Sequence, residues 1–175
     1  GAIGISRPTG NRVDVFKLQS IGFTEMNERP KRKALPHAVP DWVPDGETYF
    51  ITINCRPRGE NQLARQTQFV AIRSSVKNYT ERALWHVQLM VIMPDHLHSL
   101  MTLNTRSKSI SAIIGGWKRY LAKTEGIVWQ KNYFEHRIRS QNELFEKESY
   151  LRQNPVRADL CKNAAEWPFI IRSDR

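Results

Sequence analysis

The stretch WHVQLMVIMPDHLHSLMTL, residues 85–103, decides the fold of this chain. Apolar, aromatic and β-branched residues dominate Trp85–Ile92 and again His96–Leu103, which is typical of two strands. The Met93-Pro94-Asp95 sequence between them predicts a tight turn, because proline presets a turn dihedral and aspartate favours turns. The second strand is apolar on both faces, so we expect it to lie in the centre of a sheet.

The segments on either side of this strand pair alternate between strand and helix patterns. Residues 49–54, YFITIN, predict another strand, and apolar residues at helical spacing from Ile110 to Leu121 predict a helix. The predicted order is a strand at 49–54, a helix at about 61–78, strands at 85–92 and 96–103, a helix from 110, a short strand at 133–138 and a helix at about 141–153. This β-α-β-β-α-β-α order predicts an α+β, ferredoxin-like (split βαβ) fold, an antiparallel sheet with helices on one face, followed by a further C-terminal helix.

Composition limits the class of protein. A chain of 175 residues accommodates one domain, and its net charge of +10 favours a polyanionic partner. No run of about 18 apolar residues predicts a membrane span, and residues 1–10 lack the apolar core of a signal peptide. Two cysteines, Cys55 and Cys161, without a CxxC motif exclude a disulfide scaffold and a cysteine zinc site. We therefore expect a soluble intracellular protein.

The first 48 residues differ from the rest. They hold five of the nine prolines and show no sustained strand or helix period, and we interpret residues 1–32 as a basic, loosely ordered arm before a domain at 33–175. Residues 1–48 carry seven basic and six acidic side chains, which leaves +9 of the net charge on the remainder. The surface for a polyanion is therefore expected on the folded domain.

His96 and His98 form the first candidate site. In a strand, residues i and i+2 point to the same face, so both imidazoles project together while Leu97 enters the opposite side. Two neutral imidazoles so placed can hold one divalent metal and leave positions open for a phosphate oxygen. The alternative is a pair of hydrogen-bonded structural residues at a strand end. The apolar strand around them favours a site, because buried imidazoles are costly without partners.

Tyr150 and Asn154 form the second candidate site, on the last predicted helix. They are four residues apart and share a helix face. Tyr150 lies about 100–120° around the helix from the buried apolar stripe, on a flank from which its hydroxyl can reach a cleft. Alternatively, Tyr150 is a rim aromatic, and Asn154 caps a short helix at 156–161 with Pro155 in its first position. Spacing alone favours these structural roles.

Six stretches of the chain together match one known pattern: MPDHLH at 93–98, YLRQNPVRADL at 150–160, VWQ at 128–130, YFEHRIR at 133–139, LPH at 35–37 and YFIT at 49–52. These motifs resemble those of the HUH single-strand nucleases and, within them, the REP-associated tyrosine transposases. The similarity extends from about residue 33 to residue 167, and the order of the motifs makes it specific. Asp159 stands where the family usually has glycine, and Glu135 where it commonly has aspartate.

The resemblance implies a metal-dependent single-stranded DNA endonuclease and strand transferase, a transposase that cuts next to DNA hairpins. It implies Mg²⁺ or Mn²⁺ held by His96, His98 and Asn154, and Tyr150 as the nucleophile that forms a 5′-phosphotyrosine. The implied partner is single-stranded DNA with a REP-like hairpin, bound by a monomer or a homodimer in the cytoplasm, associated with the nucleoid. Basic residues expected to hold backbone phosphates are Lys118, Arg119, Lys123, Lys131, Arg137 and Arg139.

Aromatic residues near these cations, Trp117, Tyr120 and Trp129, could stack bases, but core packing is the favoured interpretation, especially for Trp117 on the apolar stripe. His136 is interpreted as a hydrogen-bonded structural residue. A non-catalytic or domesticated hairpin-binding protein for DNA or RNA is the alternative function, since sheet-based binding modules share this fold layout. Such a binder needs neither the histidine pair nor Tyr150, but the sequence does not separate a domesticated transposase from an active one.

Overall fold

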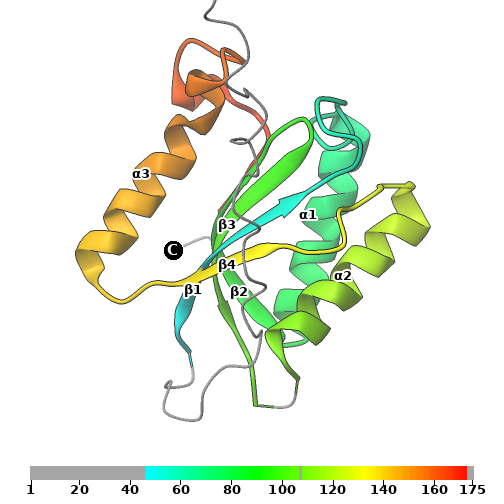
Figure 1. Ribbon diagram of the computed structural model, residues 1–175, viewed down its shortest axis with the longest axis vertical. Helices are drawn as coiled ribbons and strands as arrows, with labels where there is room; N and C mark the ends of the chain where they lie inside the picture. The colour runs from blue at the N-terminus through cyan, green and yellow to red at the C-terminus, as the bar shows by residue number, and fades with distance from the viewer. Residues whose placement is uncertain (1–45, 107, 173–175) are drawn as a thin grey trace, which may run out of the picture. The chain divides into compact units, whose positions relative to one another are not determined.

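The computed structural model describes residues 46–106 and 108–172, so the expected arm at 1–32 lies outside the described residues. Within them the chain forms one antiparallel sheet with the strand order β4-β1-β3-β2-β5 (Figure 1). The elements are β1 (Thr48–Asn54), α1 (Gln66–Glu81), β2 (Trp85–Ile92), β3 (His96–Leu103), α2 (Ile110–Glu125), β4 (Phe134–Arg137), α3 (Gln141–Arg157), a 3-10 turn at Ala164–Glu166 and β5 (Ile170–Arg172).

The arrangement of the first four strands confirms the ferredoxin-like prediction. β3 lies at the centre between β1 and β2, as its apolar character on both faces predicts. The chain enters β3 from β2 through the turn at residues 93–95, where the amide of Met93 donates to the carbonyl of His96 at 2.8 Å. The start of the central strand, which carries the two histidines, is therefore held by strands on both sides.

The two faces of the sheet carry different helices. Figure 1 shows α1 and α2 together on one side and α3 alone on the other. The first side holds the larger core, where Ile51 and Leu97 pack with Trp117 of α2. On the second side, Phe50 and Leu100 pack with Leu151 of α3. The tyrosine-bearing helix thus lies on the face opposite the split-βαβ helices.

Serine side chains fix the starts of the second and third helices. Ser109 accepts a hydrogen bond from the amide of Ala112 before α2, and Ser140 accepts one from the amide of Glu143 before α3, each at 3.2 Å. Such caps satisfy amides that have no partner inside the helix.

Among the helices at 46–106 and 108–172, none combines the length and apolar character that a membrane span requires.

Two element boundaries and one additional strand differ from the predictions. α1 begins at Gln66 rather than near residue 61, because the amides of Gln62 and Leu63 donate to the carbonyl of Pro94 and hold that segment as a loop against the turn. α3 continues past Gln153 to Arg157. β5 was not predicted, since three residues are too few for a periodic pattern; it pairs with β2 at the sheet edge.

Ala83, after the C-terminus of α1, adopts a left-handed backbone with φ of 51°. This conformation costs an L-residue about 1–2 kcal/mol, while the extra freedom of a glycine in the unfolded chain offsets about 0.4–1 kcal/mol. Ala83→Gly is therefore expected to raise the free energy of unfolding by about 0.5–1 kcal/mol in urea titrations. Ala122→Gly inside α2 should lower it by about 0.8–1.0 kcal/mol. A loss of stability in both variants would contradict the left-handed assignment.

Candidate active site

His96 and His98 project from one face of β3, as the strand period predicts. In the register with β1, His96 lies opposite Asn54 and His98 opposite Thr52. The two ring centroids are 4.8 Å apart with an interplanar angle of 82°. Leu97 points to the other face and is fully buried in the larger core. The fold therefore brings the two imidazoles into direct contact with each other.

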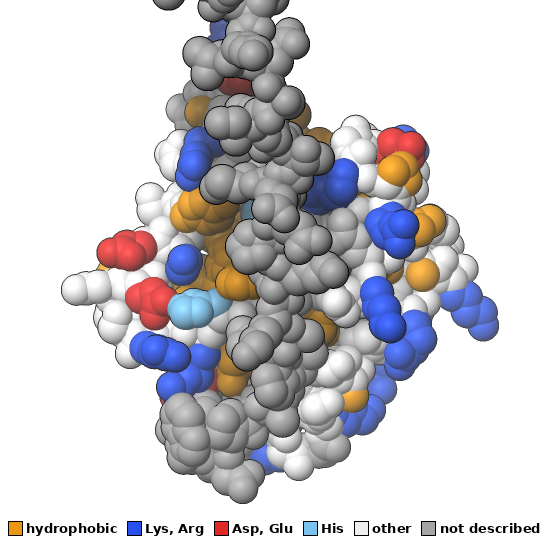
Figure 2. Space-filling view, viewed as in Figure 1, with side chains coloured by type: hydrophobic (Ala, Val, Ile, Leu, Met, Phe, Trp, Pro, Cys, Tyr) orange, Lys and Arg blue, Asp and Glu red, His pale blue; other side chains and the backbone are white. Residues whose placement is uncertain are grey.

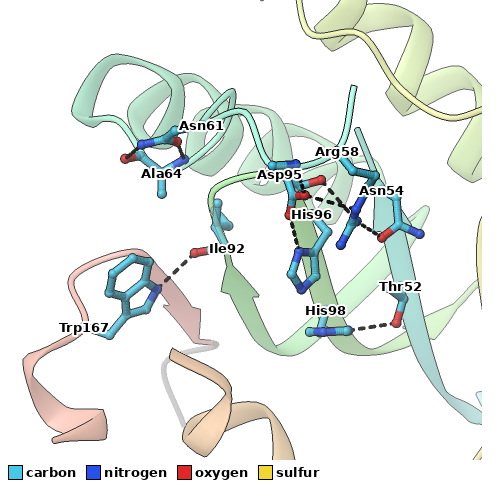
Figure 3. A network of polar contacts seen from close by, with 11 residues as sticks. Thr52, Asn54, Arg58, Asn61, Ala64, Ile92, Asp95, His96, His98 and Trp167 are labelled. Carbon is cyan, nitrogen blue, oxygen red and sulfur yellow. Dashed lines mark hydrogen bonds and ion pairs between the residues drawn. The ribbon is translucent and has the colours of Figure 1, made fainter. Parts of the chain in front are cut away.

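His98 is enclosed by β1. Its Nδ1 lies 2.7 Å from Oγ1 of Thr52 (Figure 3). Its ring stacks on that of Phe50 with centroids 5.6 Å apart. The side chain is only 7% exposed. Burial, with smaller contributions from His96 and Arg58, lowers the pKa of His98 to about 3. The ring is therefore neutral at physiological pH, the form in which an imidazole can ligate a metal.

His96 is oriented by the carboxylate that precedes it. Its Nδ1 lies 2.6 Å from Oδ1 of Asp95. Burial lowers the pKa of His96, although Asp95 acts in the opposite direction. A carboxylate at Nδ1 fixes the tautomer and leaves Nε2 as the atom with a free lone pair, as in many carboxylate–histidine–metal arrangements.

Asp95 is the centre of a small network that sequence reasoning missed. Figure 3 shows it between His96 and Arg58. Its Oδ2 accepts from the amide of Gly59 at 2.7 Å and from Nε of Arg58 at 3.0 Å, and Arg58 also donates to Oδ1 of Asn54. Burial alone would raise the pKa of Asp95, but these hydrogen bonds and the nearby cation hold it below its usual range. The sequence does contain a signal, an acidic residue directly before the first histidine. The predicted turn alone already explains an aspartate at this position.

α3 brings Tyr150 to the same place. The Tyr150 ring lies 5.9 Å from the ring of His98 and 6.2 Å from that of Phe50, in edge-on geometry with both. The side chain is 39% exposed, which agrees with the predicted position on the flank of the helix. Tyr150 is thus packed by its ring while remaining open to solvent, and the structure places it beside the histidine pair.

Asn154 does not cap a new helix, and that prediction is wrong. α3 is continuous to Arg157, and the carbonyl of Asn154 accepts from the amide of Ala158 at 3.0 Å. Pro155 is buried within the last turn of α3, and its packing stabilises that turn. The side chain of Asn154 therefore has no capping role. Its Nδ2 atom is buried and has no hydrogen-bond partner among the described residues.

The side chains beside Tyr150 include donors that fit a divalent metal. Among the described residues, no group of three or more His, Cys, Asp or Glu could hold one. Burial holds both imidazoles neutral, and Nδ1 of each ring is engaged by Asp95 or Thr52. Asn154 follows Tyr150 by one helical turn, and its buried Nδ2 has no hydrogen-bond partner among the described residues, so the amide oxygen Oδ1 is the atom that could ligate a metal. Imidazole nitrogen is a common ligand of transition metals, and an amide oxygen suits Mg²⁺ and Mn²⁺.

Most of the predicted phosphate-binding residues lie on the surface. Figure 2 shows Lys and Arg side chains gathered on the side where Figure 1 places α2. A groove of about 500 Å³ between α2 and the segment before β4 is lined by Arg119, Trp129 and Lys131. Arg137 is half-buried and forms an ion pair with Glu47 at 3.6 Å. The exposed members of the predicted set are Arg119, Lys123, Lys131 and Arg139.

Lys118 differs from the other residues that were predicted to hold backbone phosphates. It is 8% exposed, and its ammonium donates to the carbonyls of Gln130 and Lys131 at 2.7 and 3.0 Å. Burial lowers the pKa of Lys118. The long stem lets a residue beside the apolar stripe reach inward, so its charge ties α2 to the segment before β4 and is not offered to a phosphate.

Lys118→Met is expected to lower the free energy of unfolding by about 1–3 kcal/mol, because two buried carbonyls lose their donor. The salt dependence of DNA binding should stay as in the wild type. Arg119→Gln, one residue along the same helix but exposed, should instead reduce the slope of log K against log salt by about 0.7. Denaturation and fluorescence anisotropy separate the two effects. A reduced slope in Lys118→Met would show that this ammonium contacts DNA after all.

The prediction of core packing holds for two of the three aromatic residues near the cations. Trp117 is fully buried and donates to Oγ of Ser75 at 2.9 Å, and Trp129 packs against the larger core. For Tyr120 the prediction is wrong, because its side chain is 50% exposed. Nε2 of His136 lies 2.5 Å from Oε1 of Glu143, which confirms a hydrogen-bonded histidine. Asp159 adopts φ of 54°, which explains why a glycine is usual at this turn.

Comparison with known proteins gives relatives named as REP-associated tyrosine transposases. No protein-family model matches the chain. A REP-associated tyrosine transposase of Escherichia coli K12 is 27% identical over 126 residues, 71% of this chain and 75% of the relative. A Haemophilus influenzae relative named for the same family is 28% identical over 141 residues, 71% of this chain and 78% of its own length. The solved structure of a REP-associated tyrosine transposase bound to a REP hairpin matches with a TM-score of 0.66 and 25% identity, over 76% of this chain and 81% of that one.

Proposed function

Because the chain is a relative of the REP-associated tyrosine transposases in both sequence and fold, we propose that it is a metal-dependent single-stranded DNA endonuclease and strand transferase that acts next to DNA hairpins. Tyr150 is the proposed nucleophile, and His96, His98 and Asn154 are the proposed ligands of Mg²⁺ or Mn²⁺. The observation that carries the proposal is the contact between a solvent-accessible tyrosine from α3 and two neutral imidazoles from β3 on one face of the sheet.

The proposed reaction breaks one phosphodiester bond and forms another. Oη of Tyr150 attacks the phosphorus, the bond to the 3′ oxygen of the leaving strand breaks, the phenol gives up its proton and the 3′ oxygen gains one. The products are a 5′-phosphotyrosine and a free 3′-OH, and attack of another 3′-OH on the phosphotyrosine reverses the step and joins strands. A bound divalent cation would withdraw charge from the scissile phosphate.

The protein's own residues supply position and polarity. Asp95 fixes the tautomer of His96 through its Nδ1, and the hydroxyl of Thr52 orients the ring of His98 through its Nδ1. Phe50 packs against both His98 and Tyr150 and so fixes the spacing between the nucleophile and the histidine pair. The exposed cations on α2 lie across the sheet from Tyr150 and are proposed to hold backbone phosphates of the DNA outside the histidine–tyrosine site.

The test is incubation of the full chain with labelled single-stranded DNA that carries a hairpin, with Mn²⁺ or with EDTA. The proposal predicts a protein–DNA adduct that survives denaturing electrophoresis in Mn²⁺ and is missing in EDTA. Tight, saturable binding of the hairpin without any adduct in either condition would contradict the enzymatic proposal and support the alternative, a non-catalytic or domesticated hairpin-binding protein. Matched duplex DNA should give neither strong binding nor an adduct if unpaired nucleotides must enter the cleft.

A further inference from the structure

One flank of α3 carries more than the proposed nucleophile. Lys147, Tyr150, Asn154 and Arg157 follow each other at intervals of three and four residues, so they lie within about 80° of one another around the helix. We call these four residues the α3 flank. It runs beside the buried stripe that contains Leu151, and its Tyr150 ring contacts the ring of His98.

The two cations of the α3 flank are held over aromatic rings of the cleft. Nζ of Lys147 lies 5.4 Å from the centroid of the Phe50 ring, and Cζ of Arg157 lies 5.3 Å from the centroid of the Tyr150 ring. Contacts of this kind orient a cation without neutralising it. Both charges therefore lie over Phe50 and Tyr150, the two rings that contact His98.

Neither cation has an acidic partner in an ion pair among the described residues. By contrast, Arg152, on the same helix but outside the flank, is paired with Glu148. Glu143 is the acidic residue nearest to Lys147 along the flank, but its carboxylate already accepts from His136 and from the amide of Arg139. Lys147 and Arg157 thus present two positive charges beside the proposed nucleophile that form no ion pair within residues 46–106 and 108–172.

We propose that Lys147 and Arg157 bind two backbone phosphates of the single strand, one on each side of the phosphate that faces Tyr150. The inference rests on the proposed function, since it takes the single strand as the ligand of the cleft. The Cα atoms of the two cations are about 15 Å apart along the helix, and the two charged groups lie over different rings, Phe50 and Tyr150, so each is placed to meet its own phosphate. The α3 flank thereby positions the strand without any metal. The backbone of the strand runs along the helix axis past Tyr150.

The test measures binding alone, by fluorescence anisotropy of labelled single-stranded hairpin DNA with the full chain in EDTA at several salt concentrations. Lys147→Gln and Arg157→Gln are each expected to reduce the slope of log K against log salt by about 0.7 and to weaken binding about fivefold at 0.1 M salt, because each loses one phosphate contact. The double variant should lose both contributions. Lys147→Arg keeps the charge and should restore the wild-type slope. Arg152→Gln is the matched control on the same helix and should leave slope and affinity unchanged.

The outcome is separable from that of the proposed function. If Lys147→Gln and Arg157→Gln keep the wild-type slope and affinity while the wild type forms the covalent adduct, this inference is overturned and the proposed function stands. If both slopes fall but the wild type forms no adduct, the inference holds and the enzymatic proposal fails. A similar loss in Arg152→Gln would also overturn the inference, because the effect would then reflect the general charge of the helix.

Discussion

Tyr150→Phe is expected to abolish cleavage and covalent adduct formation while leaving the fold and the affinity for single-stranded DNA nearly unchanged. The substitution removes one oxygen atom and keeps the ring that packs against Phe50, His98 and Arg157. Loss of a covalent nucleophile typically lowers turnover by a factor on the order of 10⁴ or more. The measurements are denaturing electrophoresis for the adduct, anisotropy for binding and circular dichroism for the fold.

Two other tyrosines serve as controls for this prediction. Tyr120 lies on α2 and is 50% exposed, so it is as accessible as Tyr150 but belongs to the opposite face of the sheet. Tyr133 precedes β4 and packs against the larger core. Tyr120→Phe and Tyr133→Phe should retain both cleavage and the adduct. Persistence of the adduct in Tyr150→Phe, or its loss in Tyr120→Phe, would assign the nucleophile to another residue.

His96→Ala and His98→Ala are each expected to abolish measurable Mn²⁺ binding in calorimetric titrations. Removal of a residue that only orients a ligand typically costs about 10–100-fold in metal affinity, and removal of the ligand itself should cost more. His96→Ala also frees Asp95, whose carboxylate keeps its contacts with Arg58 and Gly59, so the turn should persist. Circular dichroism and denaturation confirm that each variant is folded.

His136→Ala is the matched control for the metal prediction. His136 lies on β4 next to β1, but its Nε2 is hydrogen-bonded to Glu143 rather than directed at the histidine pair. It should therefore leave Mn²⁺ binding unchanged. Wild-type Mn²⁺ binding in His96→Ala and His98→Ala together would exclude these residues as the metal ligands.

Patterns with a simple period predicted the parts of the site that lie on regular elements. Two residues apart on an apolar strand, His96 and His98 had to share a face, and the register with β1 bears this out. The helical angle between Tyr150 and the buried stripe placed its ring on a flank, where it is 39% exposed. The central position of β3 followed from its apolar character on both faces.

Local signals failed where tertiary packing decides. Asn154 before Pro155 is a strong cap signal, yet the burial of Leu151 and Pro155 against the sheet keeps α3 helical through Arg157. Lys118 stands beside an apolar stripe, and only the carbonyls of a segment 12 residues further along reveal why it turns inward. In both cases the competing interaction comes from residues that a local pattern does not include.

Residues that act through other residues were also missed. Asp95 fits a turn equally well whether or not its carboxylate orients His96, so only the fold shows the second role. A charge count cannot distinguish Lys147 and Arg157 from the other basic residues of the chain. Their significance comes from the aromatic rings beneath them, which the packing of α3 on the sheet supplies.

The most direct test of the central claim is to locate the covalent bond itself. The wild-type chain is allowed to react with single-stranded hairpin DNA in Mn²⁺, the DNA is trimmed with nuclease, and the protein is digested with trypsin and examined by mass spectrometry. Trypsin cuts after Lys147 and after Arg152, so the peptide Glu148–Arg152, ESYLR, contains Tyr150 and no other tyrosine. If Tyr150 is the nucleophile, this peptide carries a nucleotide adduct through a phosphotyrosine bond. An adduct on any other tyrosine-containing peptide, with ESYLR unmodified, would contradict it.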